Sequence, residues 1–181
     1  MNIIEVIKSG NYLILDTETT GLNTDSEIVS IAIIDAQGNT LLDTLVKPVQ
    51  PIPADATRVH GITNEQVANL ERLPVQQIYK LLNGRDVVVY NANYDRRLLQ
   101  QSSNALFTSP VQWDRTIQWY CAMKHFAEIY GDWNPKYKSY KWKTLSDACH
   151  YYRIPIEGAH GALADCLMTL KVCKAMAEAV R

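Results

Sequence analysis

Residues 12–22 read Tyr12-Leu13-Ile14-Leu15-Asp16-Thr17-Glu18-Thr19-Thr20-Gly21-Leu22. An apolar run of this kind, placed before a Thr- and Gly-rich break, predicts a strand that is buried on both faces of a sheet. Because side chains alternate along a strand, the carboxylates of Asp16 and Glu18 are predicted to point the same way, with Cα atoms about 6.6 Å apart. Two carboxylates so placed suit hard divalent cations such as Mg²⁺ and Mn²⁺. The alternative is a strand that simply ends at the surface, where acidic residues are common.

The whole chain has the composition of one globular domain. It has 181 residues, 47% of them hydrophobic and 20% charged, so we expect a single domain over residues 1–181. The formal net charge of -1 means that any contact with nucleic acid depends on a local basic patch. No stretch resembles a signal peptide or a membrane span. The cysteines show no C-x-x-C spacing, which predicts reduced, mostly buried thiols in a cytoplasmic protein, at Cys121, Cys149, Cys166 and Cys173.

The first half of the chain predicts an antiparallel meander. Strands are expected at 28–35 and 40–46, joined by a Gly-containing hairpin loop, with the first strand, which carries Asp16 and Glu18, on the buried side. Residues 1–10 are expected to be a short lead-in, and the proline-rich residues 47–57 an extended loop. Thr63 and Gln66 have the capping-box pattern of a helix that begins after Thr63. A second helix is expected from Pro74 to the stop signal Asn83-Gly84.

The second half predicts alternating helices and strands. A buried strand is expected at 86–90, a helix at 95–101, a short strand at 111–114 and a helix at 116–130. A further helix is expected at 145–152, and a last helix, with Leu163, Leu167 and Leu170 on its core face, is expected to run nearly to residue 181. A meander followed by such an alternation predicts an α/β fold, with a mixed sheet flanked by helices.

Two further places carry acidic or imidazole side chains. Asp95 follows the end of the strand at 86–90, and His160 precedes Asp165 by five residues. Five residues turn an ideal helix by about 140°, so His160 and Asp165 share a site only if His160 lies in the loop before the helix. Glycines on both sides of His160 favour that loop. Taken alone, Asp95 would be interpreted as a first-turn helix acid and His160 as a polar loop residue.

Four motifs in order resemble those of the DEDDh exonucleases, the DnaQ-like branch that includes polymerase proofreading subunits, exodeoxyribonuclease X, ribonuclease T and oligoribonuclease. The family patterns D-x-E-T-T-G-L, H-G-I-T, H-N-A-x-F-D and H-x-A-x-x-D are met at 16–22, 60–63, 90–95 and 160–165. Tyr90 stands where the family has His, and Tyr94 where it has Phe; both departures concern substrate fit. The resemblance covers residues 12–175 and implies a ribonuclease H-like mixed β-sheet, an antiparallel meander followed by parallel strands, flanked by α-helices.

The resemblance also implies a 3′–5′ exonuclease that uses two divalent metal ions, Mg²⁺ or Mn²⁺. Four carboxylates brought together cannot all stay ionised without compensating charge, which two cations would supply. The resemblance makes His160 the general base and makes Asp16, Glu18, Asp95 and Asp165 the metal ligands. For Ile62 and Tyr94 core packing is the alternative to substrate contact. The residues implied to contact the terminal nucleotide are Thr17, Thr19, Thr20, Gly21, Leu22, His60, Ile62, Asn91 and Tyr94.

The expected partner is single-stranded nucleic acid or the 3′ end of a duplex, with DNA favoured over RNA. An exoribonuclease or oligoribonuclease-type enzyme of the same fold is one alternative, because the choice depends on how the pocket treats a 2′ hydroxyl. A non-catalytic nucleic-acid-binding domain is another, disfavoured because all four acids and the histidine are present. A monomeric or homodimeric free-standing enzyme is expected rather than a polymerase subunit, since no long polymerase-binding tail follows the last helix.

Residues 130–143 read YGDWNPKYKSYKWK, in which lysines interleave with aromatic residues. Stacking and cationic contacts together hold single-stranded nucleic acid. The alternative is an ordered loop whose aromatic rings pack on the core while the lysines stay in solvent.

Overall fold

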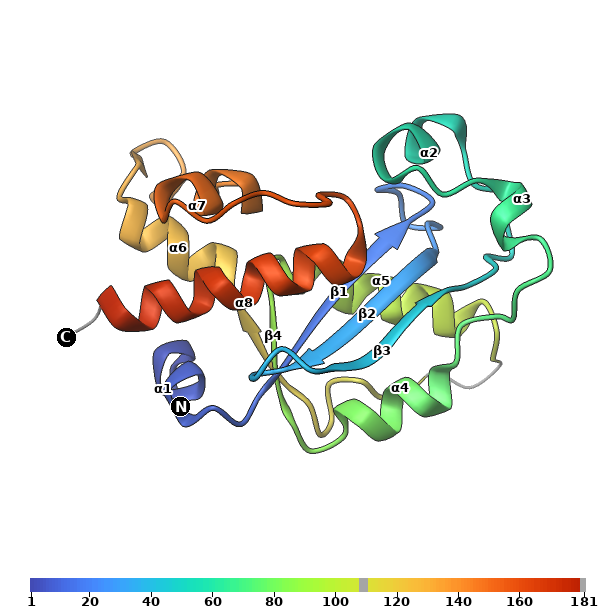
Figure 1. Ribbon diagram of the computed structural model, residues 1–181, viewed down its shortest axis with the longest axis horizontal. Coiled ribbons are helices and arrows are strands. Elements are labelled where there is room, and N and C mark those ends of the chain that lie inside the picture. The colour runs from blue at the N-terminus through green and yellow to red at the C-terminus, as the bar shows by residue number, and fades with distance from the viewer. Residues whose placement is uncertain (108–110, 180–181) are drawn as a thin grey trace.

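A five-stranded mixed sheet forms the centre of the computed structural model, which describes residues 1–107 and 111–179 (Figure 1). The strand order is β3-β2-β1-β4-β5, so β1 is the central strand. It pairs antiparallel with β2 and parallel with β4, which in turn pairs parallel with β5. The predicted ribonuclease H-like arrangement is thereby confirmed. The strands are β1 Leu13–Thr19, β2 Ile28–Asp35, β3 Thr40–Leu45, β4 Asp86–Val89 and β5 Gln118–Cys121.

Helices cover both faces of this sheet. Alternation along β1 sends Ile14 into the core that includes side chains of α1, α6, α7 and α8, while Leu13 and Leu15 enter the core shared with α4 and α5. The even-numbered Asp16 and Glu18 therefore face the α8 side. The helices are α1 Ile3–Ser9, α2 Ala54–His60, α3 Asn64–Val67, α4 Val75–Leu82, α5 Ala92–Asn104, α6 Ala122–Tyr130, α7 Leu145–Tyr151 and α8 Ala162–Ala179.

Two segments expected to be irregular contain helices. The expected lead-in forms α1, because Asn2 and Glu5 make a capping box and Gly10 ends the helix in the left-handed conformation. The expected loop at 47–57 is free of helix only as far as Pro53, the N-cap of α2. The helix begins at Ala54 and ends at Gly61, which has φ 76°. The three prolines concealed this helix, although a proline just before a helix is compatible with its start.

The prediction for residues 111–130 was wrong in its first half. Residues 111–114 form no strand; Trp113 is buried there and its Nε1 donates to Ser103 Oγ at 3.1 Å. Residues 118–121, expected to be helical, form β5, and α6 begins only at Ala122. A short apolar run fits either element, and parallel pairing with β4 decides in favour of the strand.

The other predicted elements are found, although α5 extends beyond the predicted 95–101 at both ends. The Thr63 capping box makes both of its hydrogen bonds, and α4 follows Pro74. The last helix, α8, ends at Ala179, and the two residues after it lie outside the described part of the chain. Leu170 is buried on α8, but Leu167 is 36% exposed, so the predicted core face was wrong at that position.

All four cysteines are free, and three of them are buried. In the described residues, no helix is both long and apolar enough to cross a bilayer.

Candidate active site

The acids of β1 meet the first turn of α8. Asp16 lies opposite Ala32 and Glu18 opposite Ser30 in the pairing with β2, and the register shifts directly after Glu18. One carboxylate oxygen from each of Asp16, Glu18 and Asp165 lies within 4.8 Å of the other two. The prediction that the two β1 acids point the same way is confirmed, and the third acid completes a cluster of oxygen ligands.

A tight loop places His160 beside this cluster. α8 begins at Ala162, so His160 precedes the helix, as predicted. Its φ of 65° lies in the left-handed region, where a non-glycine residue is uncommon. A Cβ at Gly161 would lie 3.3 Å from the Gly158 carbonyl oxygen, so the turn leaves little room for a side chain there. The turn thus projects an exposed imidazole to the rim of the acidic cluster.

Asp95 reaches the site from α5, on the other side of β1. Asp95 is only 4% exposed, and its carboxylate accepts a hydrogen bond of 2.8 Å from the hydroxyl of Thr17. Because Thr17 lies between Asp16 and Glu18 in the strand, its side chain points away from theirs and toward α5. Thr17 thereby orients Asp95. This role is additional to the contact with substrate that the sequence predicted for Thr17.

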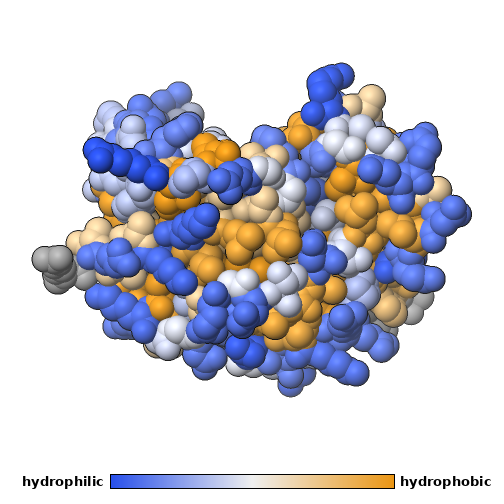
Figure 2. All heavy atoms as spheres, viewed as in Figure 1, coloured by the Kyte–Doolittle hydropathy of each residue, from blue (hydrophilic) through white to orange (hydrophobic). Residues whose placement is uncertain are grey.

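The four acids and the histidine line one small cavity of about 180 Å³. It adjoins a larger cavity of about 850 Å³, with which it shares Thr17, Glu18, Asn91 and Tyr94. Figure 2 shows the surface hollowed between the part of the molecule that carries α7 and the part that carries α2. The remaining residues of the small cavity are Asp16, Tyr90, Asp95, Leu145, His160 and Asp165.

The carboxylates that line the small cavity lie where a negative charge is costly. Burial, reinforced by Asp95, Asp165 and Glu18, raises the pKa of Asp16 well above its usual value. Burial and the same kind of repulsion raise the pKa of Glu18 to about 7. Burial raises the pKa of Asp95 to about 7 as well, although the Thr17 hydrogen bond opposes the rise. Repulsion of this kind is relieved by a bound cation.

The cluster fits a divalent metal ion. Burial raises the pKa of Asp165, and within the described part of the chain its buried Oδ1 has no hydrogen-bond partner. A buried acceptor without a donor is costly, and a cation would satisfy it. A set of carboxylate oxygens is the ligand type of Mg²⁺, Mn²⁺ or Ca²⁺ rather than of a thiophilic metal.

The larger cavity is built around the turn from Thr19 to Leu22. Gly21 has φ 152°, and a Cβ there would lie 3.3 Å from Ser26 Oγ. The Tyr94 hydroxyl lies 2.7 Å from Thr19 Oγ1 and donates to the Gly21 carbonyl at 2.9 Å. The hydroxyl that distinguishes Tyr94 from the phenylalanine of the motif therefore secures this turn. Leu22 is 77% exposed at its tip.

His60 closes the other side of this cavity in a fixed tautomer. Its Nδ1 accepts from the Ile62 backbone N–H at 3.0 Å, which leaves Nε2 to donate to the Thr19 carbonyl at 3.2 Å. Burial lowers the pKa of His60, in keeping with a neutral ring. Ile62 itself packs with Val29 and Ile52 in a small core and does not line either cavity.

Several lining residues escaped the sequence interpretation. Asp55 and Val59 of α2 and its N-cap residue Pro53 line the larger cavity, in a segment for which the sequence predicted a loop up to residue 57. Leu145, the first residue of α7, lines the small cavity. The sequence did contain one sign of a helix end here, because Gly61 directly follows a stretch with the basic residues Arg58 and His60.

The order of the sheet and the acids gathered at its central strand are those of a ribonuclease H-like nuclease. The family model described as exonuclease (RNase_T) matches residues 13–173, and the chain belongs to this DnaQ-type exonuclease family. An uncharacterized exonuclease, CP81, of Escherichia phage 186 is 42% identical over 171 residues, which cover 92% of this chain and 88% of the phage protein. The DNA polymerase III subunit epsilon of Buchnera aphidicola is 25% identical over 174 residues, covering 88% of this chain and 71% of that subunit.

Solved structures share the fold. Exonuclease X in complex with 5′ overhanging duplex DNA superposes with a TM-score of 0.69 at 24% identity, covering 93% of this chain and 92% of that chain. Exonuclease I superposes with a TM-score of 0.74 at 18% identity, covering 95% of this chain but 41% of that chain. The protein is an exonuclease of the DnaQ type, a family that is typically metal-dependent, and its acidic cluster could hold a metal ion.

Proposed function

We propose that the protein removes nucleotides from the 3′ end of DNA, acting on single strands or on the ends of duplexes as one exonuclease domain. The observation that carries the proposal is the convergence of three carboxylates, from β1 and α8, within 4.8 Å of one another beside a cavity of about 850 Å³. A cavity of this size can hold a terminal nucleotide. The scissile phosphate would then lie over the acids.

Asp16, Glu18 and Asp165 would hold the metal ions, and Asp95, oriented by Thr17, would complete the set. Two divalent cations, Mg²⁺ or Mn²⁺, would supply positive charge that offsets the charge developing on the phosphate and on the leaving 3′ oxygen. His160 lies at the rim and would accept a proton from the attacking water, because a neutral imidazole has a ring nitrogen that can act as a general base. Its exposure leaves it free to pass that proton on to solvent.

The turn from Thr19 to Leu22 would bind the terminal nucleotide. Leu22 offers an exposed apolar side chain against the base, and the turn is held by Tyr94 and His60. These contacts position the nucleotide without identifying its base. Such an arrangement suits an enzyme that removes successive nucleotides of any sequence.

DNA is proposed as the substrate because the relatives and neighbours with named substrates concern DNA. Exonuclease X was solved with duplex DNA, exonuclease I with a dT13 oligonucleotide, and the epsilon subunit belongs to a DNA polymerase. The test is the degradation of matched DNA and RNA oligonucleotides, labelled at the 5′ end so that 3′ shortening gives a ladder. Faster shortening of DNA supports the proposal. Faster shortening of RNA would transfer the assignment to an exoribonuclease.

A further inference from the structure

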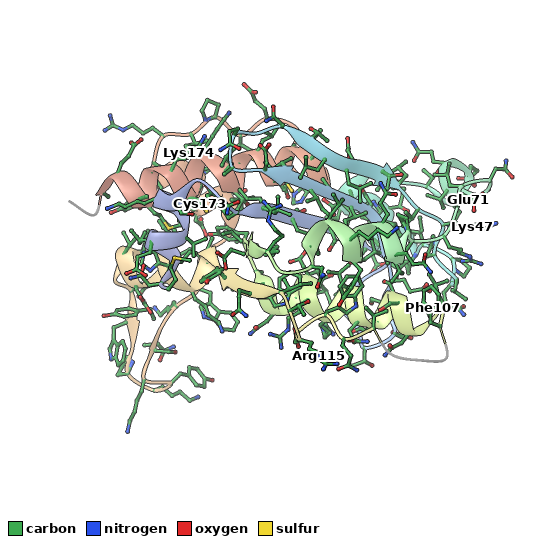
Figure 3. The ribbon with its side chains drawn as sticks, turned by 90° about the horizontal axis from the view of Figure 1, so that it is seen from below. Lys47, Glu71, Phe107, Arg115, Cys173 and Lys174 are labelled. Carbon is green, nitrogen blue, oxygen red and sulfur yellow. The ribbon has the colours of Figure 1, made fainter. Side chains whose placement is uncertain are left out.

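A hairpin of lysines and aromatic residues projects from the domain between α6 and α7. Residues 131–143, here called the Lys/aromatic hairpin, contain the two short paired strands β6 Trp133–Asn134 and β7 Ser139–Tyr140. Figure 1 shows the segment beyond α6 and α7, and Figure 3 shows it extending away from the rest of the protein. Its aromatic side chains are exposed, 49% for Trp133, 69% for Tyr137 and 63% for Trp142, so the expected alternative of rings packed on the core is excluded.

Two of its four lysines hold the base of the hairpin. The Asp132 carboxylate pairs with Lys141 Nζ at 3.0 Å and with Lys143 Nζ at 2.8 Å. Lys143 Nζ also lies 4.3 Å from the centre of the Tyr130 ring, at the end of α6. Trp133 and Tyr140 pack edge to face across the two strands, with ring centres 5.1 Å apart. A surface segment with this many internal contacts presents its rings in a defined arrangement.

The two lysines at the tip are differently placed. Among the described residues, Lys136 and Lys138 form no salt bridge, and Lys136 Nζ lies 5.3 Å from the centre of the Tyr137 ring. The hairpin as a whole carries four lysines against one aspartate, an excess of three positive charges, whereas the complete chain has a net charge of -1. This segment is thus a local basic patch of the kind that contact with a polyanion requires.

The base of the hairpin meets the acidic cavity. The Tyr90 hydroxyl donates to the carbonyl oxygens of Lys143 and Thr144, at 2.9 and 2.7 Å, and Tyr90 lines the small cavity. Leu145, the next residue, lines the same cavity. Trp142 precedes Leu145 by three residues, which span at most about 11 Å. The backbone of Trp142, whose indole is exposed, therefore lies close to the lining of the cavity, and the hairpin extends outward from there (Figure 3).

We propose that the Lys/aromatic hairpin binds the single-stranded segment that lies 5′ of the terminal nucleotide. The inference rests on the proposed function, because it assumes that the 3′ end occupies the acidic cavity. Trp142 and Tyr137 stack on bases, and Lys136 and Lys138 contact phosphates. Positive charge interleaved with exposed rings favours nucleic acid over an apolar protein surface, which would leave the lysines without partners. Stacking on any base and contact with any phosphate make this binding independent of sequence.

The test is affinity as a function of strand length and salt, measured by fluorescence anisotropy with oligothymidylates. Catalytically inactive Asp16→Asn protein in Ca²⁺ serves as the background, so that the strands survive. Lys136→Ala/Lys138→Ala should weaken the binding of long strands and lower the slope of log K against log salt by about 1.4, or about 0.7 for each phosphate contact. Trp142→Ala should weaken the same strands by about fivefold to a hundredfold. For the shortest strands the ratio of wild-type to variant affinity should fall toward one.

The matched control is Lys80→Ala/Lys174→Ala, which removes two exposed lysines from α4 and α8. It lowers the net charge equally, so an equal loss of affinity in the control would overturn the inference. An unchanged salt slope and affinity at every length in the tip variant would overturn it as well. Circular dichroism shows whether the Trp142→Ala protein is folded. If it is not, the affinity and salt slope of the Lys136→Ala/Lys138→Ala protein test the inference instead.

Different results would contradict the proposed exonuclease activity and the proposed role of the hairpin. If the wild-type protein shortens no DNA or RNA of any length, the proposed function is wrong. If the wild-type protein shortens DNA while the hairpin variants bind long strands normally, only the hairpin inference is wrong. If the hairpin instead contacts a second copy of the chain, the mass measured by sedimentation velocity should differ between wild type and Trp142→Ala, while the affinity for oligonucleotides stays the same. That result would overturn the hairpin inference.

Discussion

The Thr17 hydroxyl donates to Asp95 Oδ1 at 2.8 Å, which ties the strand that carries two of the acids to the helix that carries a third. The two residues are 78 positions apart in the sequence. The hydrogen bond opposes the burial that raises the pKa of Asp95, so it favours the ionised carboxylate that a metal ion requires. A threonine between two acids is thus part of the site although its side chain points to the opposite face of the sheet.

Replacing Thr17 with valine tests this relationship, because valine keeps the shape and removes the donor. A buried Asp95 oxygen would then lack its partner, and we expect apparent metal affinity or turnover to fall by about 10–100-fold. The measurement is the rate of oligonucleotide shortening across a Mn²⁺ titration. Thr17→Ser, which restores a hydroxyl, is the control and should recover most of the loss. Wild-type metal dependence in the valine variant would show that Asp95 is oriented by other contacts.

Removing one acid should stabilise the metal-free protein while abolishing activity. The pKa values of Glu18 and Asp95 are about 7 in the folded chain, against about 4 in an unfolded one, and that of Asp16 is raised in the same direction. Below about pH 4 both states are protonated, and as pH rises toward 7 the unfolded chain loses protons first, so these groups progressively favour unfolding. Asp16→Asn relieves this repulsion. In EDTA it should therefore raise Tm at pH 8 by more than at pH 5.

Each kcal/mol gained corresponds to about 2–4 °C for a protein of this size. Thermal unfolding followed by circular dichroism at the two pH values is the measurement. Asp35→Asn, at a surface turn where hydrogen bonds lower the pKa of the acid, is a control that should destabilise at pH 8. An Asp16→Asn protein less stable than wild type at pH 8 in EDTA would contradict the electrostatic account of the cluster.

The sequence predicts those features of the site that depend on residues close together in the chain. The alternation of Asp16 and Glu18, the pairing of their strand and the loop position of His160 follow from spacing and from flanking glycines, and all three are found in the structure. The Thr17–Asp95 hydrogen bond depends on how α5 packs on β1, which no local pattern encodes. The identity of β5 likewise depends on a partner strand far away in sequence.

The exposure of the Lys/aromatic hairpin could not be predicted either. Its rings suit a core and a binding platform equally well, and the sequence left both open. In the structure, the Asp132 ion pairs hold the hairpin together internally, and the Tyr90 hydroxyl attaches its base to the rest of the domain, which leaves the rings in solvent. Tyr90, which differs from the motif, thus links the acidic cavity to the hairpin.

Removing the metal should abolish activity. It should also remove the thermal stabilisation that bound metal provides, and that stabilisation should depend on pH. We expect no shortening of DNA in EDTA and recovery with Mg²⁺ or Mn²⁺. Because the carboxylates must be deprotonated to bind a cation, saturating metal should raise Tm more at pH 8 than at pH 5. Calorimetry with and without metal at the two pH values measures this difference. Full activity in excess EDTA would exclude the acids as metal ligands.

His160→Ala should reduce turnover without releasing the metal. Loss of a general base lowers the rate by about 10²–10⁴-fold. The metal-induced rise in Tm should remain at the wild-type value, since His160 lies beside the carboxylate cluster and outside it. His150→Ala, which removes an exposed histidine from the last turn of α7, is the matched control and should leave the rate unchanged. A normal rate in the His160 variant would assign proton transfer to another group.

Tyr94→Phe should weaken substrate binding and leave the chemical step nearly intact. The change restores the residue that the motif usually has and removes only the hydroxyl that contacts Thr19 Oγ1 and the Gly21 carbonyl. A hydrogen bond of this kind contributes about 0.5–1.5 kcal/mol, so we expect KM for a single strand to rise about two- to tenfold. The proposed contact between the turn and the nucleotide would be the same in the ground state and the transition state, so kcat should change little. Tyr79→Phe, on α4 beside Trp113, is the control for loss of a tyrosine hydroxyl elsewhere. A fall in kcat at constant KM in the Tyr94 variant would mean that the turn acts on the reacting phosphate, with Tyr94 governing the distance between the terminal nucleotide and the acids.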